Sequence, residues 1–200
     1  MAEQRAGRER RGPGRPRQEH VTAAVLEAVL ALVTESGMGA LTMDAVAARA
    51  GVSKPAMYRR WPTKQDLVIA AAESRIGSLS LPDMGDFRAE LRAVLMARME
   101  AYRQPGVARL LAGVIGTAAE AGAEPAAYRD YTARVMGQTR QLLERGVARG
   151  EVRPDVDLGD AATLVAASLF FRMIGEQRLP DAALVDSMVD MIGRAVATRP

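Results

Sequence analysis

The chain has 200 residues, enough for one large domain or two small ones, and it is 48% apolar and 26% charged. This composition is typical of a soluble globular protein with a sizeable core, and no apolar run is long enough to span a membrane. The basic N-terminus also lacks the apolar core of a signal peptide. The absence of cysteine excludes disulfides, thiol catalysis and Cys-based zinc sites, and the single His20 excludes a multi-histidine metal site. We therefore expect a cytoplasmic protein without a cofactor, in which His20 is a surface residue near the start of a helix.

Positive charge is concentrated at the N-terminus. Residues 1–17 hold six arginines against two glutamates, a net charge of +4 in a chain whose total is +3. Because this arm is rich in Gly and Pro and has no apolar periodicity, it is predicted to be disordered. Its end, PGRPR, is a partial match to arms that enter the DNA minor groove, which makes Arg15 and Arg17 candidate DNA contacts. A solvated tail, or nonspecific attraction to phosphates, is the alternative.

The rest of the chain has helical periodicity and no strand-like alternation of useful length. Glycine and proline divide it into about nine helices, which predicts an all-α protein. A loop at about 77–86 separates a short-helix region from a longer-helix region. We expect a basic arm at 1–17, an N-terminal helical domain at 18–76 and a C-terminal helical domain at 77–200. The longer predicted helices cover about 19–36, 87–103, 107–120, 125–149, 158–176 and 181–197.

Residues 41–68, LTMDAVAARAGVSKPAMYRRWPTKQDLV, predict two short helices joined by a tight turn. Thr42 is a good N-cap for the first helix, and Gly51 permits the sharp turn that follows it. Ser53 is predicted to cap the second helix, with Pro55 in the first turn, where its missing N–H is not needed. Together these signals predict a helix-turn-helix.

The second of these helices has one apolar face and one face suited to nucleic acid. Met57 and Trp61 are four residues apart and share the buried face. The outward positions near the helix start are then Lys54, Pro55, Tyr58 and Arg59. A recognition helix enters the major groove N-terminus first, where Arg can read guanine and Lys and Tyr suit phosphate oxygens. An ordinary αα-hairpin with a charged outer face is the alternative, although it gives no reason to gather Lys, Tyr and Arg here.

The arrangement resembles the DNA-binding domain of the TetR/AcrR family of transcriptional regulators over about residues 19–70. The likeness rests on LTMDAVAARAGVS, on the aromatic pair Tyr58 and Trp61, and on TKQDL, which opens the next helix. The family pattern is specific at this length. It implies an N-terminal three-helix DNA-binding domain joined to a C-terminal domain that binds an effector and dimerises.

The resemblance also assigns roles to individual residues. Arg60 stands where many members of the family have His, and its added charge is expected to strengthen contact with the DNA backbone. Ser53, at the cap of the recognition helix, joins the DNA-binding candidates. The implied phosphate contacts are Thr42, Tyr58 and Lys64, and the implied groove-facing residues are Lys54, Pro55 and Arg59.

The C-terminal half matches the family more weakly, mainly through ERGVARGEVRPDVD. Its helices carry methionine and aromatic side chains that suit an adaptable ligand pocket, and Arg134, Gln138 and Arg172 are candidate polar anchors. Ordinary core packing is the alternative for each of these residues. The candidate ligand-binding residues are Met96, Met99, Tyr102, Leu111, Tyr128, Tyr131, Met136, Phe170 and Met173.

The last two predicted helices are too apolar for one subunit to cover. Residues 158–176 are apolar on nearly all faces, and the final helix has an apolar face wider than a single stripe. We therefore expect a homodimer in which a second copy covers them around a two-fold axis. The candidate interface residues are Leu164, Ala167, Phe171, Leu184, Met188 and Met191.

The favoured function is a ligand-responsive repressor that binds a palindromic double-stranded DNA operator as a homodimer, away from membranes. A small, mostly apolar effector would release it by favouring a dimer whose recognition helices are misplaced for DNA. A DNA-binding regulator controlled by a protein partner is the alternative. An α-helical enzyme is a more remote alternative, because the sequence offers no nucleophile–histidine–acid set, phosphate loop or metal cluster.

Overall fold

The computed structural model of the chain describes residues 15–76, 83–120 and 126–198. Over these residues it contains nine α-helices, one short 3-10 helix and no β-strand beyond an isolated bridge between Val152 and Ala197, so the all-α prediction is confirmed. The helices are α1 (Arg15–Ser36), the 3-10 helix η1 (Met38–Ala40), α2 (Met43–Ala50), α3 (Lys54–Tyr58), α4 (Lys64–Ile76), α5 (Phe87–Arg103), α6 (Val107–Glu120), α7 (Ala126–Ala148), α8 (Leu158–Ile174) and α9 (Ala182–Val196).

Helix α1 begins earlier than the sequence predicts. It starts at Arg15 rather than near Glu19, with Pro16 in its first turn, where a proline lacks only an N–H that the helix does not use. The predicted disorder of the arm falls largely on residues 1–14, which lie outside the described residues and so stay untested. The side chains of Arg15 and Arg17 are also outside the described residues.

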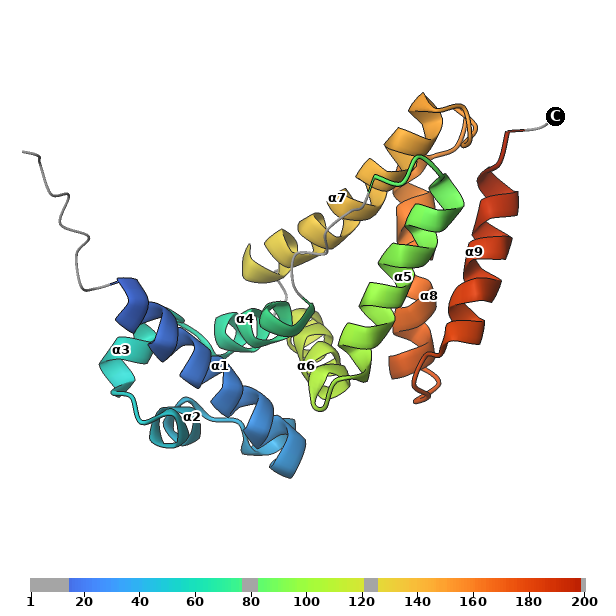
Figure 1. The fold of residues 1–200 in the computed structure, drawn as a ribbon. Helices are drawn as coiled ribbons and strands as arrows, with labels where there is room; N and C mark the ends of the chain where they lie inside the picture. The colour runs from blue at the N-terminus through green and yellow to red at the C-terminus, as the bar shows by residue number, and fades with distance from the viewer. Residues whose placement is uncertain (1–14, 77–82, 121–125, 199–200) are drawn as a thin grey trace, which may run out of the picture.

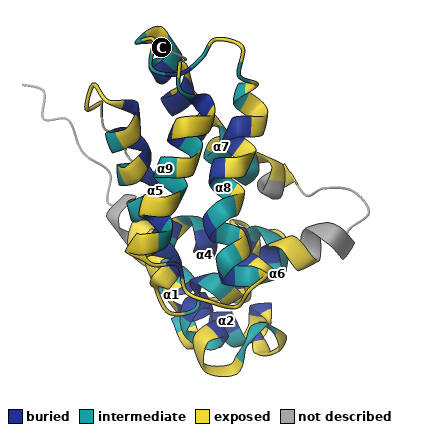
Figure 2. Cartoon of the chain, turned by 90° about the vertical axis from the view of Figure 1, so that its right-hand side faces the viewer, coloured by how far each residue is buried: buried dark blue, intermediate teal, exposed yellow. Residues whose placement is uncertain are grey.

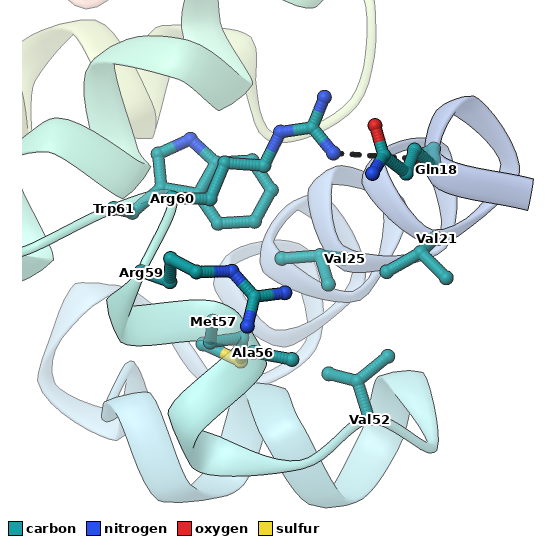
Figure 3. Close-up of a pocket in the computed structure, with 9 residues that line it drawn as sticks. All are labelled: Gln18, Val21, Val25, Val52, Ala56, Met57, Arg59, Arg60 and Trp61. Atoms are coloured by element: carbon teal, nitrogen blue, oxygen red, sulfur yellow. Dashed lines mark hydrogen bonds between the residues drawn. The ribbon is translucent and has the colours of Figure 1, made fainter. Parts of the chain in front are cut away.

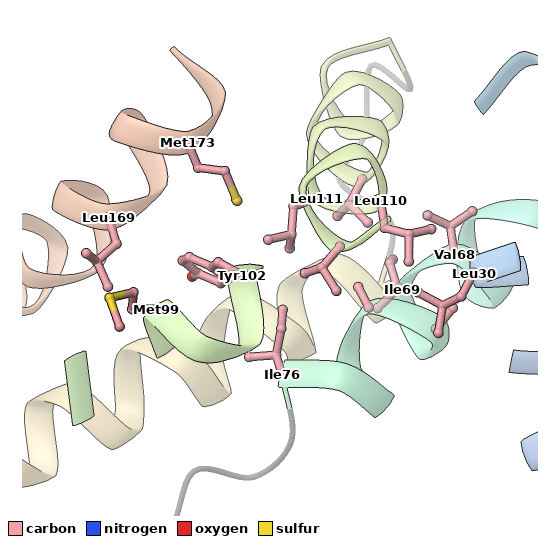
Figure 4. Packing of buried hydrophobic residues seen from close by; sticks show 14 of the residues in the cluster. Leu30, Val68, Ile69, Ile76, Met99, Tyr102, Leu110, Leu111, Leu169 and Met173 are labelled. Atoms are coloured by element: carbon pink, nitrogen blue, oxygen red, sulfur yellow. The ribbon is translucent and has the colours of Figure 1, made fainter. Parts of the chain in front are cut away.

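The helices form two groups joined through α4 and α6. Helices α1, α2 and α3 lie at one end of the molecule, and α5, α7, α8 and α9 lie at the other (Figure 1). Helix α4 packs on both α1 and α6, and one continuous set of buried apolar side chains runs through both groups. Leu110 of α6 meets Val68 and Ile69 of α4 and Leu30 of α1 in this core (Figure 4).

Helix α6 fits closely against the C-terminal end of α1. The Arg109 guanidinium donates to the carbonyl oxygens of Thr34 at 2.8 Å and Val33 at 3.2 Å, in the last turn of α1. Gly106 has φ +82°, and a Cβ atom there would lie 2.5 Å from the Thr34 hydroxyl oxygen. Helix α6 therefore cannot shift without disturbing α1.

A buried carboxylate fixes α5 against α7. Glu90 is fully buried, and its two oxygens lie 3.0 Å from Arg145 Nη2 and 3.2 Å from Arg149 Nη1. The backbone N–H of Met84 also donates to this carboxylate at 2.9 Å. A buried charge is tolerated when it is paired and hydrogen-bonded in this way, so the contact fixes the body of the C-terminal group.

Candidate nucleic-acid interface and ligand cavity

The first helix of the predicted helix-turn-helix is built as the sequence indicates. The Thr42 hydroxyl accepts a hydrogen bond from the backbone N–H of Ala45 at 3.1 Å, which caps α2. Gly51 ends the helix in the left-handed conformation, with φ 66° and ψ 33°. The chain therefore turns sharply into α3.

Helix α3 is short, and Ser53 is its N-cap residue, as predicted. Its side chain, however, accepts no hydrogen bond from the helix. The reason is local: Pro55 has no N–H to give, and the N–H of Ala56 already donates to the Ser53 carbonyl oxygen at 3.0 Å. The hydroxyl of Ser53 is thus left exposed at the start of the helix.

The buried and exposed faces of α3 follow the predicted spacing. Met57 is 2% exposed and Trp61 is 6% exposed, so both belong to the core. Tyr58 is 46% exposed, and Lys54, Pro55, Arg59 and Arg60 are also exposed. Burial of the apolar pair therefore turns these polar and basic side chains toward solvent; their contacts with DNA stay predictions.

Lys54 is engaged by an acidic neighbour. Its Nζ lies 2.6 Å from Asp44 Oδ2 in the first turn of α2. Both side chains are more than half exposed, and such surface pairs contribute little stability because water and salt screen them. Lys54 can therefore leave Asp44 for a contact with DNA at little cost.

Arg60 links the end of α3 to the start of α1. Its Nη1 donates to the Gln18 carbonyl oxygen at 3.1 Å, and its guanidinium carbon lies 5.7 Å from the centre of the Trp61 ring (Figure 3). Together with Arg59 it borders a groove of about 450 Å³ between α1 and α3. The groove is lined by Gln18, Val21, Val25, Val52, Ala56, Met57, Arg59, Arg60 and Trp61.

The next helix opens with a reciprocal cap. The backbone N–H of Thr63 donates to Asp66 Oδ2 at 3.0 Å, and the N–H of Asp66 donates to Thr63 Oγ1 at 3.1 Å. Lys64 is the first residue of α4 and is partly buried, whereas Thr42 is exposed. These caps hold Lys64 at a fixed helix N-terminus, a position that suits phosphate.

A cavity of about 210 Å³ lies between α5, α6, α7 and α8. Five of the candidate ligand-binding residues line it. The other lining residues were not predicted to bind ligand. Val135 could have been, because it is one helical turn after the candidate Tyr131 and so shares its face of α7. The lining residues are Tyr102, Leu111, Val114, Ile115, Tyr131, Thr132, Val135, Met136, Thr163, Ala166, Ala167 and Phe170.

Other ligand-binding candidates lie elsewhere. Met96, Met99 and Met173 are not among the residues that line this cavity; Met99 and Met173 lie near Leu169 in the core (Figure 4). The side chain of Tyr128 lies outside the described residues.

The proposed polar anchors do not line this cavity either. Arg134 forms an ion pair with Glu73 of α4, and Arg172 borders a different groove. Gln138 is also absent from the lining residues of the cavity. Whether these three side chains reach the cavity depends on the direction in which they leave α7 and α8, and sequence spacing alone does not show that direction.

A second apolar groove runs between α8 and α9 on the outside of the molecule. Leu164 is 68% exposed, Phe171 is 64% exposed and Met191 is 48% exposed, which is unusual for such large apolar side chains. Both helices carry exposed segments along their length (Figure 2). The groove has a volume of about 520 Å³, and all six candidate dimer residues line it. Its lining residues are Leu164, Ala167, Ser168, Phe171, Arg172, Glu176, Leu184, Met188, Met191, Ile192 and Ala195.

Among the described helices, none is long and apolar enough to cross a membrane. Two family models match the chain: residues 25–71 match bacterial regulatory proteins of the tetR family, and residues 81–192 match the tetracyclin repressor-like C-terminal domain.

Relatives and solved structures agree with these models. The chain is 33% identical over 167 residues to the HTH-type transcriptional regulator YdeS of Bacillus subtilis, covering 80% of this chain and 82% of that protein. It is 30% identical over 181 residues to the HTH-type regulator Rv1556 of Mycobacterium tuberculosis, covering 89% and 86%. The crystal structure of the TetR family transcription regulator SCO0332 superposes with a TM-score of 0.70 at 30% identity, covering 90% of this chain and all of that one.

Proposed function

This chain belongs to the TetR family of transcriptional regulators, and from that premise we propose that it is a repressor released from its operator by a small, mostly apolar effector. Binding to DNA follows from the family. The repressing role, the effector and the residues assigned to each step are the proposed part. A regulator that acts on operator DNA is proposed to be cytoplasmic.

Helix α3 supports the proposed mode of DNA binding. Its N-terminus is exposed, and Lys54, Tyr58 and Arg59 are on its solvent side. In the major groove, Arg59 and Lys54 would face base edges, while Tyr58 would hold a phosphate. Thr42 and Lys64, on the two flanking helices, would add backbone contacts that fix the orientation of α3.

The groove between α8 and α9 supports a dimer. Regulators of this family bind operators and act as dimers. A second copy seated here would cover Leu164 and Phe171 with the same surface of its own, as a two-fold interface requires. The two α3 helices would then meet successive major grooves about 34–36 Å apart.

The observation that carries the effector proposal is the position of α6. One part of α6 lines the cavity with Leu111, Val114 and Ile115. Another part holds the C-terminal end of α1 through Arg109. A ligand that changes the preferred position of α6 would therefore also move the helix-turn-helix. Release from DNA requires that the ligand bind this moved state more tightly than the DNA-binding state.

A thermal-shift screen of small apolar compounds, followed by operator release assays, tests this proposal. Compounds that raise the melting temperature of the wild type are expected to release DNA. Ala166→Trp should abolish both effects, because Ala166 lines the cavity and is partly buried. Ala133→Trp is the matched control, since Ala133 lies on the exposed face of α7 and not among the cavity residues.

Two results would count against the effector proposal. Release that persists in Ala166→Trp would place the ligand elsewhere in the molecule. Failure of every compound to shift the wild type or to release DNA would favour the regulator controlled by a protein partner.

A further inference from the structure

Arg98 is a buried cation beside the cavity. It lies on α5, one turn before the cavity residue Tyr102, and its side chain is 3% exposed. Its Nη2 donates to Thr139 Oγ1 at 2.7 Å and to the carbonyl oxygen of Val135, another cavity residue, at 3.3 Å. Its Nη1 is buried and has no hydrogen-bond partner among the described residues. The guanidinium is thus only partly satisfied.

No carboxylate neutralises Arg98 in the part of the chain that the structure describes. The charged or titratable groups that interact with it are the phenols of Tyr102 and Tyr131. Burial lowers the pKa of Arg98 and raises the pKa of Tyr102, so the Tyr102 phenol stays neutral near pH 7 and supplies no countercharge.

Glu90 is the other buried charged residue over the described part of the chain, and it is paired differently. That carboxylate has two arginines and a backbone N–H around it. Arg98, on the same helix, has a hydroxyl and a carbonyl oxygen instead. What sets Arg98 apart is that it has no carboxylate partner among the described residues, and an unpaired buried charge is strongly destabilising.

We propose that Arg98 binds an anionic group of the effector, so that the natural ligand is an amphipathic carboxylate or similar anion with an apolar body. This inference rests on the proposed function, because it concerns the same cavity. The apolar body lies among Leu111, Val114 and Phe170. Arg98 does not itself line the cavity, so Tyr102 and Tyr131 move aside to let the anionic end reach its Nη1. Effector binding then supplies a charge partner that the described residues do not provide.

Calorimetric titration of the full-length protein with matched compound pairs tests the inference. We would use octanoate against octanamide, and 4-phenylbutanoate against 4-phenylbutanamide, because each pair shares its apolar body and differs in charge. The carboxylates are expected to bind the wild type about 10- to 100-fold more tightly than the amides, as charged hydrogen bonds typically allow. Arg98→Met should remove this preference. Arg134→Met, which removes an exposed arginine of α7, should keep it.

The melting temperature of ligand-free Arg98→Met gives a second readout. Removing an unpaired buried charge in favour of an apolar side chain should leave the melting temperature unchanged or raise it. Thr139 remains satisfied, because its hydroxyl also donates to the Val135 carbonyl oxygen at 3.2 Å. A clear fall in the melting temperature would mean that Arg98 has a structural role, which would overturn the inference.

The outcomes separate this inference from the proposed function. Neutral compounds that bind the cavity and release operator DNA, with no advantage for carboxylates, would overturn only the anionic ligand. A carboxylate preference that survives in Arg98→Met would do the same. If no compound, charged or neutral, binds the wild type, the cavity is not an effector site. Both the effector proposal and the anionic-ligand inference would then be wrong.

Discussion

Arg59 and Tyr58 are adjacent on α3, yet they should affect DNA binding differently. Arg59→Ala is expected to reduce discrimination at one or two base pairs by about 1–3 kcal/mol, because a bidentate contact with guanine would be lost. Tyr58→Phe is the comparison: it removes a phosphate hydrogen bond and should weaken binding to all sequences alike. Binding measured across single-base operator variants distinguishes the two. An unchanged sequence profile in Arg59→Ala would contradict the groove-facing assignment.

Single residues were predictable where the deciding contact is local. The Thr42 cap and the buried pair Met57 and Trp61 depend on neighbours within one helical turn, and the structure has them as predicted. Ser53 occupies the predicted N-cap position, but its hydroxyl makes no cap hydrogen bond, because Pro55 and the Ser53 carbonyl together leave it no free N–H. The absence of this hydrogen bond also has a local cause, and the missing N–H of Pro55 could have predicted it.

At the scale of elements, the contact between α6 and α1 can be tested through Gly106. Gly106→Ala should destabilise the protein by about 1–3 kcal/mol, because it adds a strained positive φ and a collision with the Thr34 hydroxyl. Gly85→Ala is the matched control, with φ +71° and no atom within 4 Å of the added Cβ, so it should lose only about 1 kcal/mol. Chemical denaturation of both variants measures the difference. Equal losses would mean that α6 is not held against α1 in solution.

Helix number and order followed from periodicity, whereas contacts between distant helices did not. The start of α1 was missed because residues 15–18 carry no apolar side chain, so only the Pro16 signal was available. Arg98 was missed for a different reason: its partners Val135 and Thr139 are 37 and 41 residues away. Sequence spacing cannot show which residue of α7 faces α5 once the helices cross.

For the whole molecule, the apolar groove between α8 and α9 predicts a dimer that is needed for tight DNA binding. Leu164→Arg places a charge in this groove and is expected to give a monomer, with loss of operator binding although the helix-turn-helix is unaltered. Leu179→Arg is the control, because Leu179 is also an exposed apolar side chain, at 57%, but lies outside the groove. Sedimentation velocity and operator binding on both variants give the result. A dimer that survives in Leu164→Arg would place the interface elsewhere.

Selection of genomic DNA fragments by the wild-type protein most directly tests whether the chain reads an operator as a two-fold pair of recognition helices. The selected fragments are expected to share an inverted repeat whose half-site centres are about one helical turn apart, 34–36 Å. Leu164→Arg should fail to enrich the same fragments. Enrichment of sites without two-fold symmetry, or equal enrichment by the monomeric variant, would contradict a dimeric repressor that binds through α3.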